Sequence, residues 1–131
     1  MKAPVACLLS LMLAASAHAQ DATESRTWAW RGGIDAGAWL KTERRGNRVR
    51  FELELNRGAP SHNSGQASGE FTIRHHLGIY QSDEYPDCVL AFAFVGDTVE
   101  IRQSGASADC GFGFSVMADH LLTLEPQQAE P

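Results

Sequence analysis

The sequence is short of cysteine, of basic side chains and of long apolar runs. It has three cysteines among 131 residues, and 11 lysines and arginines against 16 aspartates and glutamates, for a formal net charge of −5. Such a chain lacks the basic face with which a general nucleic-acid binder displaces counterions from phosphates. After the first twenty residues no apolar run reaches the roughly 20 residues that a membrane-spanning helix needs. The composition therefore argues against a nucleic-acid partner and against an integral membrane helix beyond residue 20.

Local signatures of enzymes and metal sites are also missing. No nucleophile-elbow motif marks a serine, and Gly111-Phe112-Gly113 follows a cysteine rather than the strand that precedes a phosphate-binding loop. Neighbouring residues on a strand point to opposite faces, so His75 and His76 would not share one metal ion unless the turn that holds them reorients them. We therefore predict no catalytic residue, no metal and no cofactor.

The first residues are typical of a secretory signal peptide. Lys2 supplies a positive start, residues 5–15 form an apolar run, and Ala17-His18-Ala19 has the small-x-small pattern of a cleavage site. A membrane anchor is the alternative, but the run is shorter than a spanning helix. We predict a signal peptide at 1–19, a single β domain at 20–131 with a formal net charge of −6 after the loss of Lys2, and a periplasmic or secreted location.

Removal of the leader takes Cys7 with it and leaves Cys88 and Cys110, which in an exported domain are expected to form a disulfide. A metal site is the alternative, but neither cysteine has histidine or carboxylate ligands at the usual spacing. In a plain three-stranded meander the two Cα atoms would be about 10 Å apart, beyond the roughly 7 Å that a disulfide allows. Either Cys110 lies off the strands, in a loop folded over the strand end, or the two strands are direct neighbours in a curled sheet.

Hydrophobic alternation with a period of two dominates the rest of the chain. Between 48 and 56, apolar residues at 49, 51, 53 and 55 alternate with arginine and glutamate, which predicts a strand with one buried face. Residues 39–44 are its expected partner, with a turn at Arg45-Gly46-Asn47. Residues 88–94 are apolar on both faces, so this strand should be covered on both sides or lie in the middle of the sheet.

Further short strands are predicted at 27–30, 70–74, 77–81, 98–103, 112–116 and 121–124, and residues 57–69 are loop-like in composition. No stretch has helical periodicity. The fold class we predict is all-β, a small antiparallel β-barrel or sandwich of about eight strands with one disulfide.

A resemblance supports an exported protein. The pattern Cys88-x-Leu90-x-Phe92-x-Phe94, followed by Asp109-Cys110-Gly111-Phe112-Gly113, resembles a group of small exported bacterial proteins that share a Cys…CGFG motif and mostly have no assigned activity. The similarity covers roughly residues 66–124. In architecture alone, an acidic exported β domain with one disulfide is similar to bacterial periplasmic lysozyme inhibitors, and this implies a basic exported protein as partner.

Three functions are compatible with these features. The first is a periplasmic protein-binding module, possibly an inhibitor of a basic wall hydrolase such as lysozyme, with two polar loops as its binding residues: Ser61, His62 and Asn63, and Asp83, Glu84, Tyr85 and Asp87. The second is a carrier of an apolar small molecule in a pocket lined by Trp28, Trp30 and Trp39, although tryptophans on a strand face more often belong to a core. The third is a structural or stress protein of the cell envelope.

Overall fold

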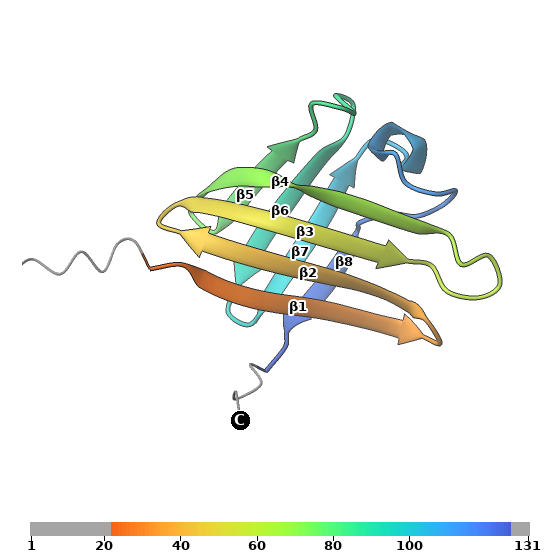
Figure 1. The fold of residues 1–131 in the computed structure, drawn as a ribbon, viewed down its shortest axis with the longest axis horizontal. Helices are drawn as coiled ribbons and strands as arrows, with labels where there is room; N and C mark the ends of the chain where they lie inside the picture. Colours follow the sequence, from red (N-terminus) through yellow and green to blue (C-terminus); the bar gives the residue numbers. More distant parts are fainter. Residues whose placement is uncertain (1–21, 127–131) are drawn as a thin grey trace, which may run out of the picture.

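The computed structural model describes residues 22–126 and shows a closed barrel of eight antiparallel strands, each paired with its neighbours in the sequence (Figure 1). The predicted signal peptide lies outside the described residues. The elements are β1 (Glu24–Gly33), β2 (Ala36–Arg45), β3 (Arg48–Asn56), β4 (Ser64–Arg74), β5 (Leu77–Gln81), β6 (Val89–Val95), β7 (Thr98–Ser104), the short 3₁₀ helix η2 (Ser107–Cys110) and β8 (His120–Leu124). The predicted all-β class is confirmed, as a barrel rather than a sandwich.

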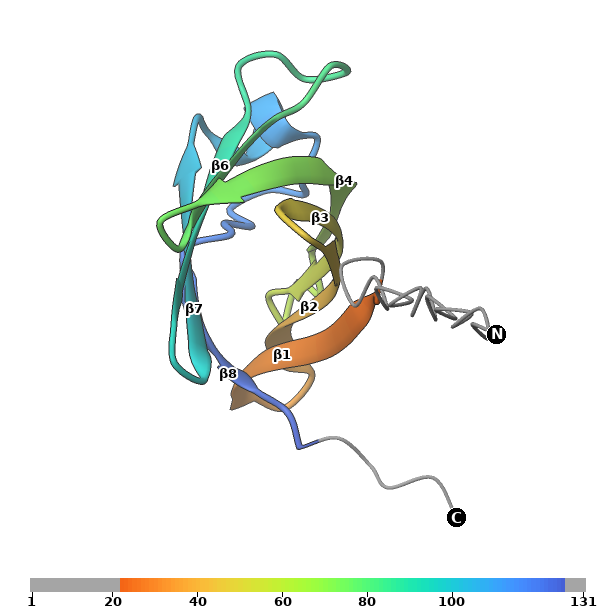
Figure 2. The same cartoon turned by 90° about the vertical axis from the view of Figure 1, so that its left-hand side faces the viewer.

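The barrel has two walls whose strands run in different directions. The long strands β1 to β3 form one wall, and the shorter β6, β7 and β8 form the wall that faces it (Figure 2). The last strand closes the barrel by pairing with the first, through Trp28 with Leu124 and Ala29 with Thr123. No helix in residues 22–126 is long and apolar enough to cross a lipid bilayer.

Side chains that were predicted to point inwards fill the interior of the barrel. Residues 49, 51, 53 and 55 of β3 are all buried, and the turn between β2 and β3 falls at Gly46 and Asn47. The inward residues of β6 and the residue before it, Cys88, Leu90 and Phe92, are also buried. This strand lies inside the sheet, paired with β5 and β7, which is one of the two predicted alternatives; its outward residues at 89, 91 and 93 remain partly exposed, so it is not covered on both faces.

Aromatic side chains occupy the centre of the interior. The ring of Phe51 lies 5.7 Å from that of Phe71, 4.9 Å from that of Tyr80 and 5.0 Å from that of Phe92, measured between centroids. Trp28 lies towards the barrel end that carries the β4–β5 and β6–β7 turns, and it donates a hydrogen bond from its indole Nε1 to Thr42 Oγ1, 3.2 Å away. That bond satisfies Thr42, the buried polar residue of this core.

Small residues on the inner face of β4 make room for large rings from other elements. A Cβ atom at Gly69 would lie 2.4 Å from the ring of Tyr80, and one at Gly65 would lie 2.7 Å from the ring of Phe112. Such distances are far shorter than van der Waals contact, so any larger residue would displace these rings. The first half of β4 therefore has no bulky side chain of its own directed into the barrel.

Two predicted boundaries are wrong in this region. Strand β4 begins at Ser64, inside the segment predicted to be a loop, because its pairing with β3 compensates for its polar and glycine-rich composition. Residues 112–116 form no strand but belong to the loop between β7 and β8. Phe112 is buried over Gly65, and the Gly113 backbone N–H donates to Ser64 O at 2.9 Å, the close approach that a glycine there permits.

The predicted disulfide between Cys88 and Cys110 is present, with a Cα–Cα distance of 4.8 Å. Cys88 directly precedes β6, whereas Cys110 is the last residue of η2, outside the strands. This confirms the prediction that Cys110 lies in a loop folded over the strand end. The bond thereby holds the loop of residues 105–119 against the barrel.

Candidate functional site: a groove between β4 and β5

Three loops meet at one end of the barrel. In an up-and-down barrel alternate connections fall at the same end, so the loops 57–63, 82–88 and 105–119 are neighbours. The disulfide joins the second to the third, and the hydrogen bond from Gly113 to Ser64 O joins the third to the start of β4. Both predicted binding loops therefore lie at this end, and loop 105–119 connects them.

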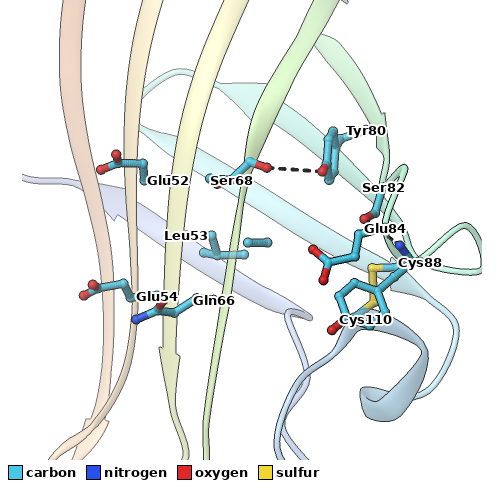
Figure 3. A pocket seen from close by; sticks show the side chains of 12 residues that line it. Glu52, Leu53, Glu54, Gln66, Ser68, Tyr80, Ser82, Glu84, Cys88 and Cys110 are labelled. Atoms are coloured by element: carbon cyan, nitrogen blue, oxygen red, sulfur yellow. Dashed lines mark hydrogen bonds between the residues drawn. A yellow bond between two sulfur atoms is a disulfide. The ribbon is translucent and has the colours of Figure 1, made fainter.

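The barrel wall opens between β4 and β5 near this end. The two strands pair only through Ile73 with Gly78 and Arg74 with Leu77. Farther along, the Tyr80 hydroxyl donates a hydrogen bond to Ser68 O at 3.2 Å, so a side chain spans the opening where a strand ladder would otherwise continue (Figure 3). Paired strands lie about 4.8 Å apart, and a bridge made by a whole tyrosine side chain indicates a wider separation.

This opening forms a groove of about 490 Å³, which we call the β4–β5 groove. Its walls come from β3, β4, β5, the loop 82–88 and the disulfide, and its lining residues are Glu52, Leu53, Glu54, Gln66, Ala67, Ser68, Tyr80, Ser82, Glu84, Tyr85, Cys88 and Cys110. Three of them are carboxylates and none is lysine or arginine. The lining residues therefore carry a negative formal charge, and a cationic group is the chemistry that such a lining favours.

The carboxylates lie on different sides of the groove. Glu84 projects from the loop 82–88 towards the strands, whereas Glu52 and Glu54 lie on β3 with their carboxylates directed away from Glu84 (Figure 3). No group of three or more histidine, cysteine, aspartate or glutamate side chains in residues 22–126 is arranged to hold a metal ion. The arrangement is suited to several separate contacts with a basic surface rather than to one shared ion.

The loop 82–88 is held in place by its own hydrogen bonds. The Tyr85 backbone N–H donates to Ser82 Oγ at 3.0 Å, and Tyr85 O accepts from the Cys88 N–H at 2.9 Å. Gln81 Nε2 also donates to Pro86 O at 2.9 Å. Because these bonds and the disulfide fix the loop, little ordering is required when a partner binds, and preorganisation of this kind favours affinity.

The structure brings part of the predicted binding set together. Glu84 and Tyr85 line the groove, while Asp83 and Asp87 belong to the same loop but do not line it. The other predicted loop lies at the same end of the barrel but does not line the groove. His62 lines a separate hollow with Trp39, Asn63 Nδ2 donates to Phe114 O at 3.1 Å, and Ser61 is exposed.

Several groove residues were missed by sequence reasoning. Glu52 and Glu54 are visible as the outward positions of β3, but an alternating strand does not reveal which outward residues border an opening. The glycines and alanine at 65, 67 and 69 were the available signal, because a run of small inward residues marks the place where β4 receives rings from elsewhere.

The three tryptophans proposed as an aromatic pocket lie apart. Trp28 lines a hollow with Thr42 and Phe94 at the far end, Trp30 lines another with Leu55 and His120, and Trp39 is on the outer face of β2 beside Asp35. They do not line a common pocket, so the carrier hypothesis gains no support from their positions.

His120 stacks on Trp30 at the start of β8, with ring centroids 4.3 Å apart and an interplanar angle of 20°. Burial lowers the pKa of His120 below its usual 6.5, against the opposing effects of a backbone hydrogen bond with Met117 and of the Asp119 carboxylate. The unfolded chain therefore binds this proton more readily than the folded protein does. The contribution of His120 to the free energy of unfolding should be fully present above about pH 6.5 and should be lost as the pH is lowered through that value.

We expect thermal unfolding of the oxidised protein to shift to lower temperature between about pH 7.5 and pH 5.5, above the range where most carboxylates titrate. His120→Gln should reduce this shift, and His62→Gln serves as the matched control on an exposed histidine. An equal shift in wild type and His120→Gln would contradict the assignment to His120.

Searches against protein-family models, curated proteins and solved structures found no match to this chain.

Proposed function

We propose that the protein is an exported, non-catalytic binding module that takes basic side chains of a partner protein into the β4–β5 groove. The observation that carries the proposal is the lining of the groove, with three carboxylates, two tyrosines and no basic residue. Lysine and arginine side chains are attracted by the carboxylates and by the faces of tyrosine rings. The signal-peptide-like pattern of the first residues supports a partner in the periplasm or outside the cell.

A basic wall hydrolase such as lysozyme is the partner that we propose to test first. Its positive surface would be steered towards an acidic protein, and complementary charge mainly raises the rate of association. A groove at the loop end of a rigid barrel, held by a disulfide, can present its rim to a cleft or to a protruding basic segment. A structural envelope role remains the alternative if no such partner binds.

The direct experiment measures inhibition of C-, G- and I-type lysozymes and their binding to the oxidised protein by calorimetry. Glu84→Lys should weaken binding by about tenfold, equivalent to about 1.4 kcal/mol, and should reduce the dependence of association on salt, because it places a positive charge on the groove wall. Asp97→Lys, in the turn at the opposite end of the barrel, has the same effect on net charge and serves as the control.

Two outcomes separate the parts of this proposal. Absence of binding at micromolar excess for all three lysozyme types would exclude lysozyme as the partner. If wild type binds but Glu84→Lys and Asp97→Lys bind equally, then the partner does not use the groove, and the acidic surface acts only through its total charge.

A further inference from the structure

The outer face of β5 and β6 is apolar and uncovered. On β5, Leu77 is 46% exposed and Ile79 is 53% exposed, and on β6 the outward residues include Ala91 and Ala93, both partly exposed. The outer faces of β2 and β3 differ, since they carry Lys41, Glu43, Arg50, Glu52 and similar residues. We call the four residues 77, 79, 91 and 93 the β5–β6 strip.

The strand register fixes where the large and small side chains of this strip lie and which charged residues flank it. Residues directly opposite each other on antiparallel strands point to the same face, and the pairs Arg74–Leu77, Leu77–Ala93 and Ala93–Glu100 form one row across β4, β5, β6 and β7. The neighbouring row pairs Ile79 with Ala91. The large side chains are thus on β5 and the small ones on β6. Arg74 lies beyond β5, and beyond β6 Arg102 continues the row of Ala91 and contacts Glu100 Oε1 at 2.6 Å, so Glu100 can offer its second carboxylate oxygen to a further cation.

This order is complementary to itself under a two-fold rotation. An axis parallel to the strands, lying between β5 and β6 in the plane of contact, places β5 of one copy over β6 of another. Leu77 then lies over Ala93 of the second copy, and Ile79 lies over Ala91 of the second copy. Arg74 at one edge faces Glu100 of the second copy, and the same contact is repeated at the other edge.

We propose that the protein associates with a second copy of itself through the outer faces of β5 and β6. Large side chains over alanines allow the two sheets to approach closely, as in aligned sheet packing, and the flanking charges select the orientation. An isologous contact of this kind uses the same patch on both subunits. The strip includes no residue that lines the β4–β5 groove, so this dimer is independent of the proposed binding function.

The test is sedimentation equilibrium of the oxidised protein from about 10 µM to about 1 mM, a range chosen because small interfaces form weak, reversible complexes. Wild type should show a monomer–dimer equilibrium. Arg74→Glu or Glu100→Arg, tested separately, should each raise the dimer Kd at least about tenfold, because each places like charges opposite one another at both edges. Lys41→Glu, on the outer face of β2, should leave the Kd unchanged.

Mixing the two charge variants gives the sharpest result. In a mixed dimer of Arg74→Glu with Glu100→Arg, opposite charges face each other at both edges, so the mixture should associate more tightly than either variant alone, although Glu100→Arg also loses the ion pair with Arg102 of its own chain. Ala91→Arg, which adds a long charged side chain in the centre of the strip, should abolish association in every combination. Far-ultraviolet circular dichroism checks that each variant is folded.

Each alternative result overturns the proposal. A protein that stays monomeric throughout the concentration range forms no such dimer. Association that is insensitive to Ala91→Arg uses another surface. Charge variants that each weaken association but fail to associate with each other would show that the two copies do not meet in the register proposed here.

Discussion

Phe92→Ala should lower the free energy of unfolding by about 4 kcal/mol, the largest effect that we expect from a single substitution in this barrel. The Phe92 side chain is fully buried, and its ring centroid lies 4.8 Å from that of Phe71 and 5.0 Å from that of Phe51. Replacing it with alanine removes apolar contacts and leaves a cavity between the two walls, where backbone strands cannot collapse inwards without breaking their ladders.

Phe114→Ala is the matched control for this prediction. The same atoms are removed from a residue that is 81% exposed, in the loop between β7 and β8, so the change should stay within about 0.5 kcal/mol. Urea unfolding followed by tryptophan fluorescence measures both values. Equal destabilisation by the two substitutions would mean that the aromatic cluster around Phe92 does not form the core.

Removal of the disulfide should have the second largest effect. The double variant Cys88→Ser, Cys110→Ser releases a closed loop whose ends are 22 residues apart, and the chain-entropy relation gives a loss of about 3 kcal/mol. For a domain of this size the melting temperature should fall by on the order of 10 °C. The cause is the larger conformational freedom of the unfolded chain, together with looser attachment of residues 105–119.

Reduction of wild type provides the control without any substitution. Wild type in excess thiol should melt close to the double variant, and the double variant itself should not respond to the thiol. A loss below about 1 kcal/mol would contradict the prediction, because the loop would then be held by the burial of Phe112 and its hydrogen bonds alone.

The same bond affects the proposed site. Cys88 and Cys110 both line the β4–β5 groove, and the loop 82–88 that carries Glu84 ends at Cys88. We therefore expect partner binding to weaken together with stability when the disulfide is removed, whereas Phe114→Ala should affect neither. A binding defect without a loss of stability would indicate a direct contact between the partner and the disulfide.

The local sequence pattern was sufficient to predict most of the strands. The alternation at 48–56, the turn at Gly46 and the two cysteines predicted a stapled antiparallel β fold, and the structure confirms each of these features. Local pattern was misleading at β4 and at residues 112–116. In β4 the glycines leave room for the rings of Tyr80 and Phe112. After Cys110 the apolar and small residues alternate as in a strand, but the segment forms a loop.

The candidate site was only half visible for the same reason. Glu84 and Tyr85 could be proposed because they lie in a polar loop, but Glu52 and Glu54 are outward residues of a regular strand that any solvated sheet would carry. Their inclusion in a groove depends on the separation of β4 from β5, which results from contacts between residues far apart in the sequence.

The amino-acid sequence by itself determined the fold class, the inward and outward faces of most strands and the pairing of the two cysteines, because these depend on periodicity and on the pairing options of few residues. Only the tertiary structure decided that the sheet closes into a barrel, where its wall opens and which outer face stays apolar. Closure needs β1 to meet β8, and the opening needs Tyr80 to reach Ser68, contacts that no local stretch of the chain encodes.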